Sequence, residues 1–383
     1  MTMIQEDKGI NYKRFIKNTM IKALSLFIIL NFVIGFVPKG GNIGRISLYN
    51  QVFPGRIRLP FGENPRNAYN LSLYDLESMF ASHEITAGSK PDEEFRVILI
   101  GDSATWGILL EPENTIGGII NSKYLKSCDG RKVYTYNLAY PSMSLLKDLM
   151  ILEKALTYDP DLIIWPITLE SFPAKNQIQT PLVANNPHVV EPLIDRFELS
   201  VTDYMSDINQ PSFWDLTLIG RRRSIFDALQ LQFLGVLWSA TGVDQTYPLN
   251  YTPAQQDFSE DDTMFHGWSS PTLPVEQLSV DIIKAGHVLA GGIPILLVNE
   301  PILISNGQNS DIRYNFFYPR WAYDHYRTLI QSQAQQSGWY YIDLWDVIPS
   351  TQFTNSAVHF TRQGSFLYYQ HLEQPLKELL CQK

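Results

Sequence analysis

The chain has 383 residues, 45% of them hydrophobic and 18% charged, which suits one large globular domain with insertions or two small domains. Its 39 acidic and 30 basic residues give a formal net charge of −9, and this balance argues against a nucleic-acid partner. The two cysteines, Cys128 and Cys381, form no metal-binding spacing. They could pair if the fold brought them together, but the sequence favours two free thiols.

The amino-terminal segment predicts a membrane anchor. Residues 1–18 are polar and basic, whereas residues 20–37 are almost uncharged and long enough to cross a bilayer. No small-residue cleavage site follows, so an uncleaved signal anchor is favoured over a cleaved signal peptide or a buried core helix. The basic flank predicts a cytoplasmic amino terminus and an extracytoplasmic domain. We therefore expect a single-pass protein of the cell membrane that contacts lipid through residues 20–37.

The sequence divides into three regions. Residues 1–38 are the tail and anchor, residues 39–94 are an extended lead-in, and residues 95–383 form the main domain. The lead-in is rich in Gly, Pro and Asn, with a short strand expected at 56–59 and a short helix at 71–83 that Ser72 could cap.

The main domain alternates apolar runs with helical patterns, which predicts a parallel α/β sheet. The expected strands are 97–100, 133–137, 162–167, 293–298 and 339–344, and the expected helices are 116–126, 145–158, 275–290, 321–337 and 364–380. An insertion at about 172–274 separates the third and fourth strands. Within it we expect loops at 181–192 and 243–271, and an apolar helix at 225–238. That helix is too short to span a bilayer, so it is predicted to cover the sheet edge near Ser103 as a lid or to lie in the membrane interface beside basic residues 221–223.

Two short stretches at opposite ends of the main domain carry the candidate chemistry. The first strand ends at Gly101-Asp102-Ser103, a strand-to-helix turn at the carboxyl edge of the sheet, where open α/β sheets place their sites. A serine there has an exposed hydroxyl and nearby backbone N–H groups, as a nucleophile requires, although a helix cap is the alternative. His359 lies on a loop just before the last helix and is followed by Thr361 and Gly364.

These two stretches resemble the opening and closing blocks of the SGNH (GDSL-type) hydrolase family, and the resemblance covers roughly residues 91–383. It implies a flavodoxin-like three-layer fold with a five-stranded parallel sheet, with Ser103 as the nucleophile and His359 as the base. The family usually has Asp three residues before this histidine, where the chain has Ser356. Asn355, or a backbone carbonyl near it, would then orient His359.

The middle blocks are altered. Residues 136–142 resemble the second block, with Ser142 in place of the usual oxyanion-hole glycine; its backbone N–H remains a possible donor. The third block falls on residues 168–171, so Glu170 replaces the usual asparagine. A carboxylate there would repel an oxyanion unless it were protonated or turned away.

Three further polar residues have two interpretations each. Asn137 would bond the loop that carries Ser103 or serve as a plain turn residue. Asp102 is expected to order its turn rather than to move protons. Glu300, after the fourth strand, would contact substrate or act as a cap.

The sequence thus predicts a membrane-anchored serine esterase or O-acyltransferase that needs no cofactor or metal. The resemblance implies that its substrate would be an ester-linked acyl group, including acetyl, of a cell-envelope glycan or lipid. The alternative is a catalytically degenerate domain that binds a surface glycan or a protein partner, which Glu170 and Ser356 favour.

Overall fold

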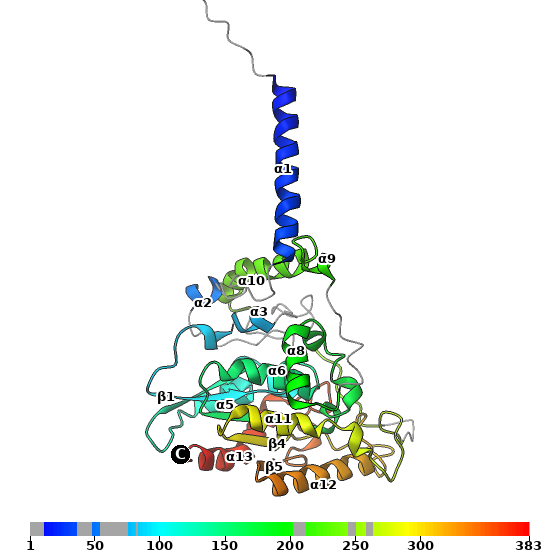
Figure 1. Cartoon of the computed structure of the whole chain (residues 1–383). Coiled ribbons are helices and arrows are strands. Elements are labelled where there is room, and N and C mark those ends of the chain that lie inside the picture. The colour runs from blue at the N-terminus through cyan, green and yellow to red at the C-terminus, as the bar shows by residue number, and fades with distance from the viewer. Residues whose placement is uncertain are drawn as a thin grey trace, which may run out of the picture.

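The computed structural model describes residues 11–36, 48–53, 76–81, 83–201, 212–243, 250–257 and 263–382. One long amino-terminal helix, α1 (Tyr12–Gly35), projects from an α/β domain (Figure 1). Its side chains are mostly exposed, and its length and composition would allow it to cross a membrane. The helix begins eight residues before the predicted apolar run, so it includes the basic residues that precede that run.

A five-stranded sheet organises the domain, and every strand pair within it is parallel. The spatial order is β2-β1-β3-β4-β5. The strands are β1 (Glu94–Leu99), β2 (Lys132–Asn137), β3 (Leu162–Ile167), β4 (Ile295–Asn299) and β5 (Tyr340–Asp343). This is the flavodoxin-like order, which confirms the predicted fold class. Its switch point lies between β1 and β3, where ligands bind outside the carboxyl ends of the strands.

The central strands are nearly continuous apolar runs, as expected where helices cover both faces of a sheet. Strands β3 and β4 are buried along their whole lengths. On one face, α6 (Leu145–Leu156) packs against α11 (Val280–Ala290). A Cβ at Gly286 would overlap the ring of Trp165, so glycine lets α11 approach the sheet closely. The domain also contains the helices α5 (Ile116–Ser122), α12 (Arg320–Ser337) and α13 (Arg362–Leu379).

The parts outside the sheet agree less well with the sequence predictions. The predicted strand at 56–59 and Ser72 lie outside the described residues, while α3 (Leu76–Ala81) falls inside the predicted helix at 71–83. The loop predicted at 181–192 is wrong, because this stretch forms α7 (Pro181–Ala184) and most of α8 (Pro187–Phe197). Each helix begins with a proline, which suits the first helical position because no backbone N–H is required there.

Residues 212–243 of the insertion lie at the foot of α1. They contain α9 (Phe213–Leu216) and α10 (Arg222–Thr241), and α10 includes the predicted apolar helix. Helix α10 packs against α2 (Leu48–Val52), where the Leu48 N–H donates to Gln232 Oε1 at 2.6 Å. Figure 1 shows α10 lying across the end of the domain from which α1 projects.

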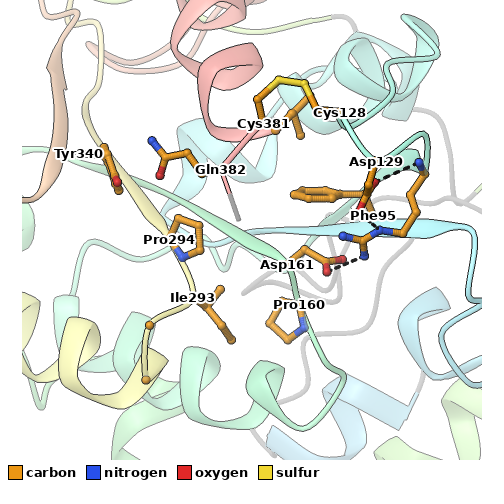
Figure 2. A pocket seen from close by; sticks show the side chains of 14 residues that line it. Phe95, Cys128, Asp129, Pro160, Asp161, Ile293, Pro294, Tyr340, Cys381 and Gln382 are labelled. Carbon is orange, nitrogen blue, oxygen red and sulfur yellow. Dashed lines mark hydrogen bonds and ion pairs between the residues drawn. A yellow bond between two sulfur atoms is a disulfide. The ribbon is translucent and has the colours of Figure 1, made fainter.

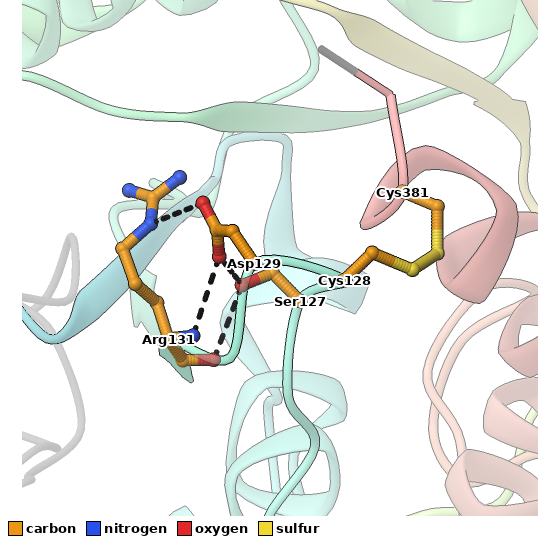
Figure 3. Close-up of a disulfide and its surroundings, with 5 residues drawn as sticks. All are labelled: Ser127, Cys128, Asp129, Arg131 and Cys381. Carbon is orange, nitrogen blue, oxygen red and sulfur yellow. Dashed lines mark hydrogen bonds and ion pairs between the residues drawn. A yellow bond between two sulfur atoms is a disulfide. The ribbon is translucent and has the colours of Figure 1, made fainter.

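The expectation of two free thiols is wrong, because Cys128 and Cys381 form a disulfide (Figure 3). Helices α5 and α13 pack together, so the turn that follows α5 meets the carboxyl end of α13. The Cys128 N–H donates to the Leu380 carbonyl at 3.2 Å, and the two cysteine Cα atoms are 4.8 Å apart, within bonding range.

Replacing both cysteines by serine should lower the free energy of unfolding by about 2–5 kcal/mol, because a bridge across a long loop restricts the unfolded chain. The sequence separation between the two cysteines is 253 residues. Denaturant unfolding of the two proteins would measure the difference. A reducing agent should lower the stability of the wild type to that of the variant and leave the variant unchanged. Equal midpoints for the oxidised wild type and the variant would contradict the prediction.

Candidate active site

Ser103 is the first residue of α4 (Ser103–Trp106), directly after β1. The turn before it depends on Gly101, whose φ of +146° is accessible to glycine and strained for other residues. A Cβ at Gly101 would also lie 2.7 Å from the Thr105 hydroxyl oxygen. Asp102 caps the helix by accepting from the Ala104 N–H at 2.8 Å. The local sequence therefore holds Ser103, half-buried, at the carboxyl end of β1 beside the switch point.

A short antiparallel pairing of the residues on either side of the loop before α13 positions His359. The Thr354 N–H donates to the His359 carbonyl at 2.8 Å, and Phe353 bridges Phe360. Thr361 then caps α13 by accepting from the Gly364 N–H at 3.0 Å. These bonds fix both ends of the short loop and present the imidazole toward the sheet edge.

The structure brings three of the predicted residues into one chain of hydrogen bonds. His359 Nε2 lies 2.8 Å from Ser103 Oγ, although the residues are 256 positions apart. His359 Nδ1 lies 2.8 Å from Asn355 Oδ1. An Nδ1–H that donates to Asn355 leaves Nε2 as the acceptor for the serine hydroxyl, which is the tautomer that a general base needs. Burial lowers the pKa of His359 to about 4, so the ring is neutral at neutral pH.

The backbone N–H groups of Ser103 and Ser142 are the two candidate oxyanion donors, and they differ in whether they are free to donate. The Ser103 N–H makes no hydrogen bond within the described part of the chain, so it is free to donate to an oxyanion. The Ser142 N–H donates to the Tyr140 carbonyl at 2.7 Å and is thus engaged inside its own turn. This use of Ser142 weakens its assignment as a donor.

Glu170 follows β3 and pairs with a histidine of the insertion. Its two carboxylate oxygens lie 2.9 and 3.0 Å from His266 Nε2. The hydrogen bond to Glu170 raises the pKa of His266, which favours the imidazolium and an ion pair. The carboxylate charge is therefore directed to His266, and the repulsion that the sequence suggested is reduced. Nothing in the local sequence around His266 marks it as this partner.

Asn137 and Asp102 both support the Ser103 segment. The Asn137 side-chain amide donates to the Thr105 carbonyl at 2.9 Å, and its oxygen accepts from the Ala139 N–H at 3.2 Å. These bonds tie the end of β2 to the turn after β1. Because both ends of the amide are used within the protein, Asn137 acts here as a support rather than as a substrate ligand.

A buried group of charged side chains lies beneath the Ser103 turn. Lys147, with no exposed surface, donates to the Gly101 carbonyl at 2.6 Å and the Tyr140 carbonyl at 3.1 Å. Its ammonium also pairs with Asp148 at 2.5 Å. The lysine therefore joins the nucleophile turn to the loop after β2. The local sequence gives no sign of this role, because a lysine in an amphipathic helix is ordinarily exposed to solvent.

Glu300 belongs to the same buried group, so its side chain is not exposed at the surface of the site. It is 1% exposed, and burial, followed by the charge of Asp102, raises its pKa well above the usual range. Burial also raises the pKa of Asp102, while Lys147 opposes that shift. Burial and the neighbouring Asp102 carboxylate therefore favour the protonated form of Glu300.

The described cavity lies at the opposite edge of the sheet (Figure 2). Its lining includes Phe95 at the start of β1, Pro294 just before β4 and Tyr340 at the start of β5. These are amino ends of parallel strands, whereas Ser103 follows a carboxyl end. The cavity beside the disulfide is thus separate from the Ser103 site. Among the described residues, no group of three His, Cys, Asp or Glu side chains could hold a metal ion.

No protein-family model and no curated protein matches this chain. Among solved structures, it is similar to a carbohydrate acetylesterase family member from Sinorhizobium meliloti, with 12% identity and a TM-score of 0.32 over 74% of this chain and 98% of that one. The native aryl esterase of M. smegmatis is 14% identical, with a TM-score of 0.32 over 74% of this chain and 99% of that one. The sequence identity and the TM-score are low in both comparisons, so the fold assignment rests on the strand order.

Proposed function

We propose that this protein is a serine esterase that uses Ser103 as its nucleophile and His359 as its general base. The observation that carries the proposal is the continuous hydrogen-bonded chain from Ser103 Oγ through the His359 ring to Asn355 Oδ1. A serine and a neutral imidazole at hydrogen-bonding distance, with the far ring nitrogen held by an acceptor, are the parts that acyl transfer requires.

The reaction would proceed in two halves. His359 Nε2 takes the Ser103 hydroxyl proton while Oγ attacks the ester carbonyl carbon. The protonated ring then returns the proton to the leaving oxygen as the old carbon–oxygen bond breaks, which leaves an acyl-serine. Water, or an acceptor hydroxyl, next gives its proton to His359 and attacks the acyl carbon. Ser103 recovers its proton, and an acid or a new ester is released.

We further propose that the substrate is an acyl ester of the cell envelope and that the domain lies outside the cytoplasm. The exposed, apolar helix α1 supports an anchored protein, and the Cys128–Cys381 disulfide supports an oxidising compartment. An enzyme tethered in this way would act on glycan or lipid esters near the membrane surface. Transfer to an acceptor hydroxyl differs from hydrolysis only in the second half-reaction.

A membrane-impermeant fluorophosphonate probe tests both proposals in one experiment. Intact cells should yield protein labelled at Ser103, and the purified full-length chain should hydrolyse acyl esters. Labelling only after the cells are permeabilised would refute the topology and leave the esterase proposal intact. If the purified, folded protein neither reacts with the probe nor cleaves any ester in a broad panel, the esterase proposal is wrong.

The second candidate function is a degenerate domain that binds a glycan or a protein partner. The engaged Ser142 N–H favours it, because one oxyanion donor would have to leave its turn before it could serve catalysis. Glycan binding without probe labelling would support this candidate.

Substituting Asn355→Asp should raise kcat by about tenfold, because a carboxylate holds the Nδ1–H more strongly and stabilises the imidazolium formed during the reaction. The base must be neutral, so kcat/KM should fall in the wild type as pH drops through the His359 pKa of about 4. The new charge raises that pKa, and the acidic limb should move to higher pH. Profiles of kcat/KM against pH would measure both effects.

Two further variants serve as controls for the Asn355 prediction. Asn355→Ala should lower kcat, because it removes the acceptor that holds Nδ1. Ser356→Asp places a carboxylate at the family's usual position. It should raise kcat less than Asn355→Asp does, because Asn355 already accepts the hydrogen bond from His359 Nδ1. A larger gain from Ser356→Asp would show that Asn355 is not the group that orients the ring.

A further inference from the structure

Helix α10 carries an apolar face that is exposed in the described part of the chain. Phe226, Leu229, Phe233 and Leu237 are 63%, 51%, 66% and 59% exposed. Their spacing of three or four residues places them in one row along the helix. The opposite side of the helix faces the protein, where Ser239 is buried. Four large exposed side chains in one row form a continuous apolar surface that would be unfavourable in water.

The segment before α10 is attached to the end of α1. Asn31 Oδ1 accepts from the Ile219 N–H at 2.9 Å. The Phe32 ring stacks on Phe213 with the ring centroids 5.9 Å apart. A Cβ at Gly35 would lie 2.9 Å from the Phe213 ring, so glycine permits this close contact. These contacts hold α9 against the last turns of α1, where a spanning helix would leave the bilayer.

Basic and aromatic side chains lie at the junction of α9 and α10. Arg222 and Arg223 are exposed at the start of α10, and Trp214 is 63% exposed on α9. Arginine side chains pair with anionic headgroups, and tryptophan favours the boundary between headgroups and acyl chains. The charge and the aromatic ring therefore occur at one level, where α1 meets the domain.

We propose that α9 and α10 lie in the interface of the bilayer that α1 crosses. The row from Phe226 to Leu237 enters the acyl boundary, and Arg222 and Arg223 contact anionic lipid phosphates. Figure 1 supports this arrangement, since α10 lies across the end of the domain from which α1 projects. The row from Phe226 to Leu237 is exposed, whereas Ser239 on the other side of the helix is buried. The inference rests on the proposed membrane anchor. Contact of α9 and α10 with the lipid would hold the domain at a fixed height and orientation above the bilayer.

Fluorescence quenching in vesicles tests this placement with the full-length protein. Single cysteines at Phe233, Ile28 and Val288 would carry an environment-sensitive fluorophore, while the two native cysteines remain in their disulfide. Vesicles of phosphatidylcholine, with or without phosphatidylglycerol, would contain lipids with a nitroxide placed high or low on the acyl chain. Val288, 67% exposed on α11, is the matched control away from the membrane.

The label at Phe233 should lose most of its fluorescence to the shallow nitroxide, the label at Ile28 to the deep nitroxide, and the label at Val288 to neither. Phosphatidylglycerol should increase the loss at Phe233, and Arg222→Gln with Arg223→Gln should remove that increase. If Ile28 is quenched and Phe233 is not, the interfacial placement is wrong and the anchor stands. If Ile28 is not quenched, the anchor itself is wrong. Energy transfer between labels at Phe233 on different copies, without lipid quenching, would assign the face to a second copy and overturn the proposal.

Discussion

Ester cleavage should be lost when Ser103 is replaced by alanine, with kcat falling by about 10⁴- to 10⁶-fold. In the proposed mechanism the Ser103 hydroxyl oxygen forms the acyl-enzyme, so the variant would retain only binding and oxyanion stabilisation. The fold should be retained, since the hydroxyl bonds to His359 and the backbone of the turn is held by Gly101 and Asp102.

Kinetics on a short soluble ester would measure the fall, and thermal unfolding would verify the fold. Ser122→Ala is the matched control, because it also removes one hydroxyl, on α5. That variant should keep near wild-type activity. Substantial turnover by Ser103→Ala, with no loss of the acyl-enzyme, would show that another residue is the nucleophile.

Replacing His359 by alanine should produce a fall in kcat similar to that of Ser103→Ala. The two residues act as one unit, so the double variant should be little worse than either single variant. Added imidazole should restore part of the activity of His359→Ala, because the small base can occupy the space that the ring leaves. It should restore nothing in Ser103→Ala, which lacks the nucleophile.

His287→Ala is the matched control for the loss of a histidine. Burial lowers the pKa of His287 to about 4, as it does for His359, but His287 lies on α11 and stacks on Trp339. Its replacement should affect stability more than turnover. Equal losses of kcat in the two variants would indicate that His359 acts through folding and not as the base.

The single sequence was sufficient to predict the sheet and the position of Ser103. The central strands β3 and β4 are short apolar runs buried along their whole lengths, so local composition is enough to indicate that both faces of these strands are covered. Gly101 and Asp102 mark the end of β1 in the same local way, through a positive φ and a helix cap. The main local error was the stretch at 181–192, where prolines that begin helices were interpreted as loop residues.

The contacts that complete the candidate site could be decided only by the tertiary structure. The approach of His359 to Ser103 agrees with the family resemblance, but the choice of Asn355 over Ser356 depends on the path of one loop. The Glu170–His266 pair and the burial of Lys147 join segments whose local patterns carry no sign of one another. The disulfide likewise depends on how α5 packs against α13. Local sequence determines where a strand or a turn forms, because its energy comes from neighbours in the chain; a side chain's partner from a distant segment is determined by packing, which the sequence specifies only as a whole.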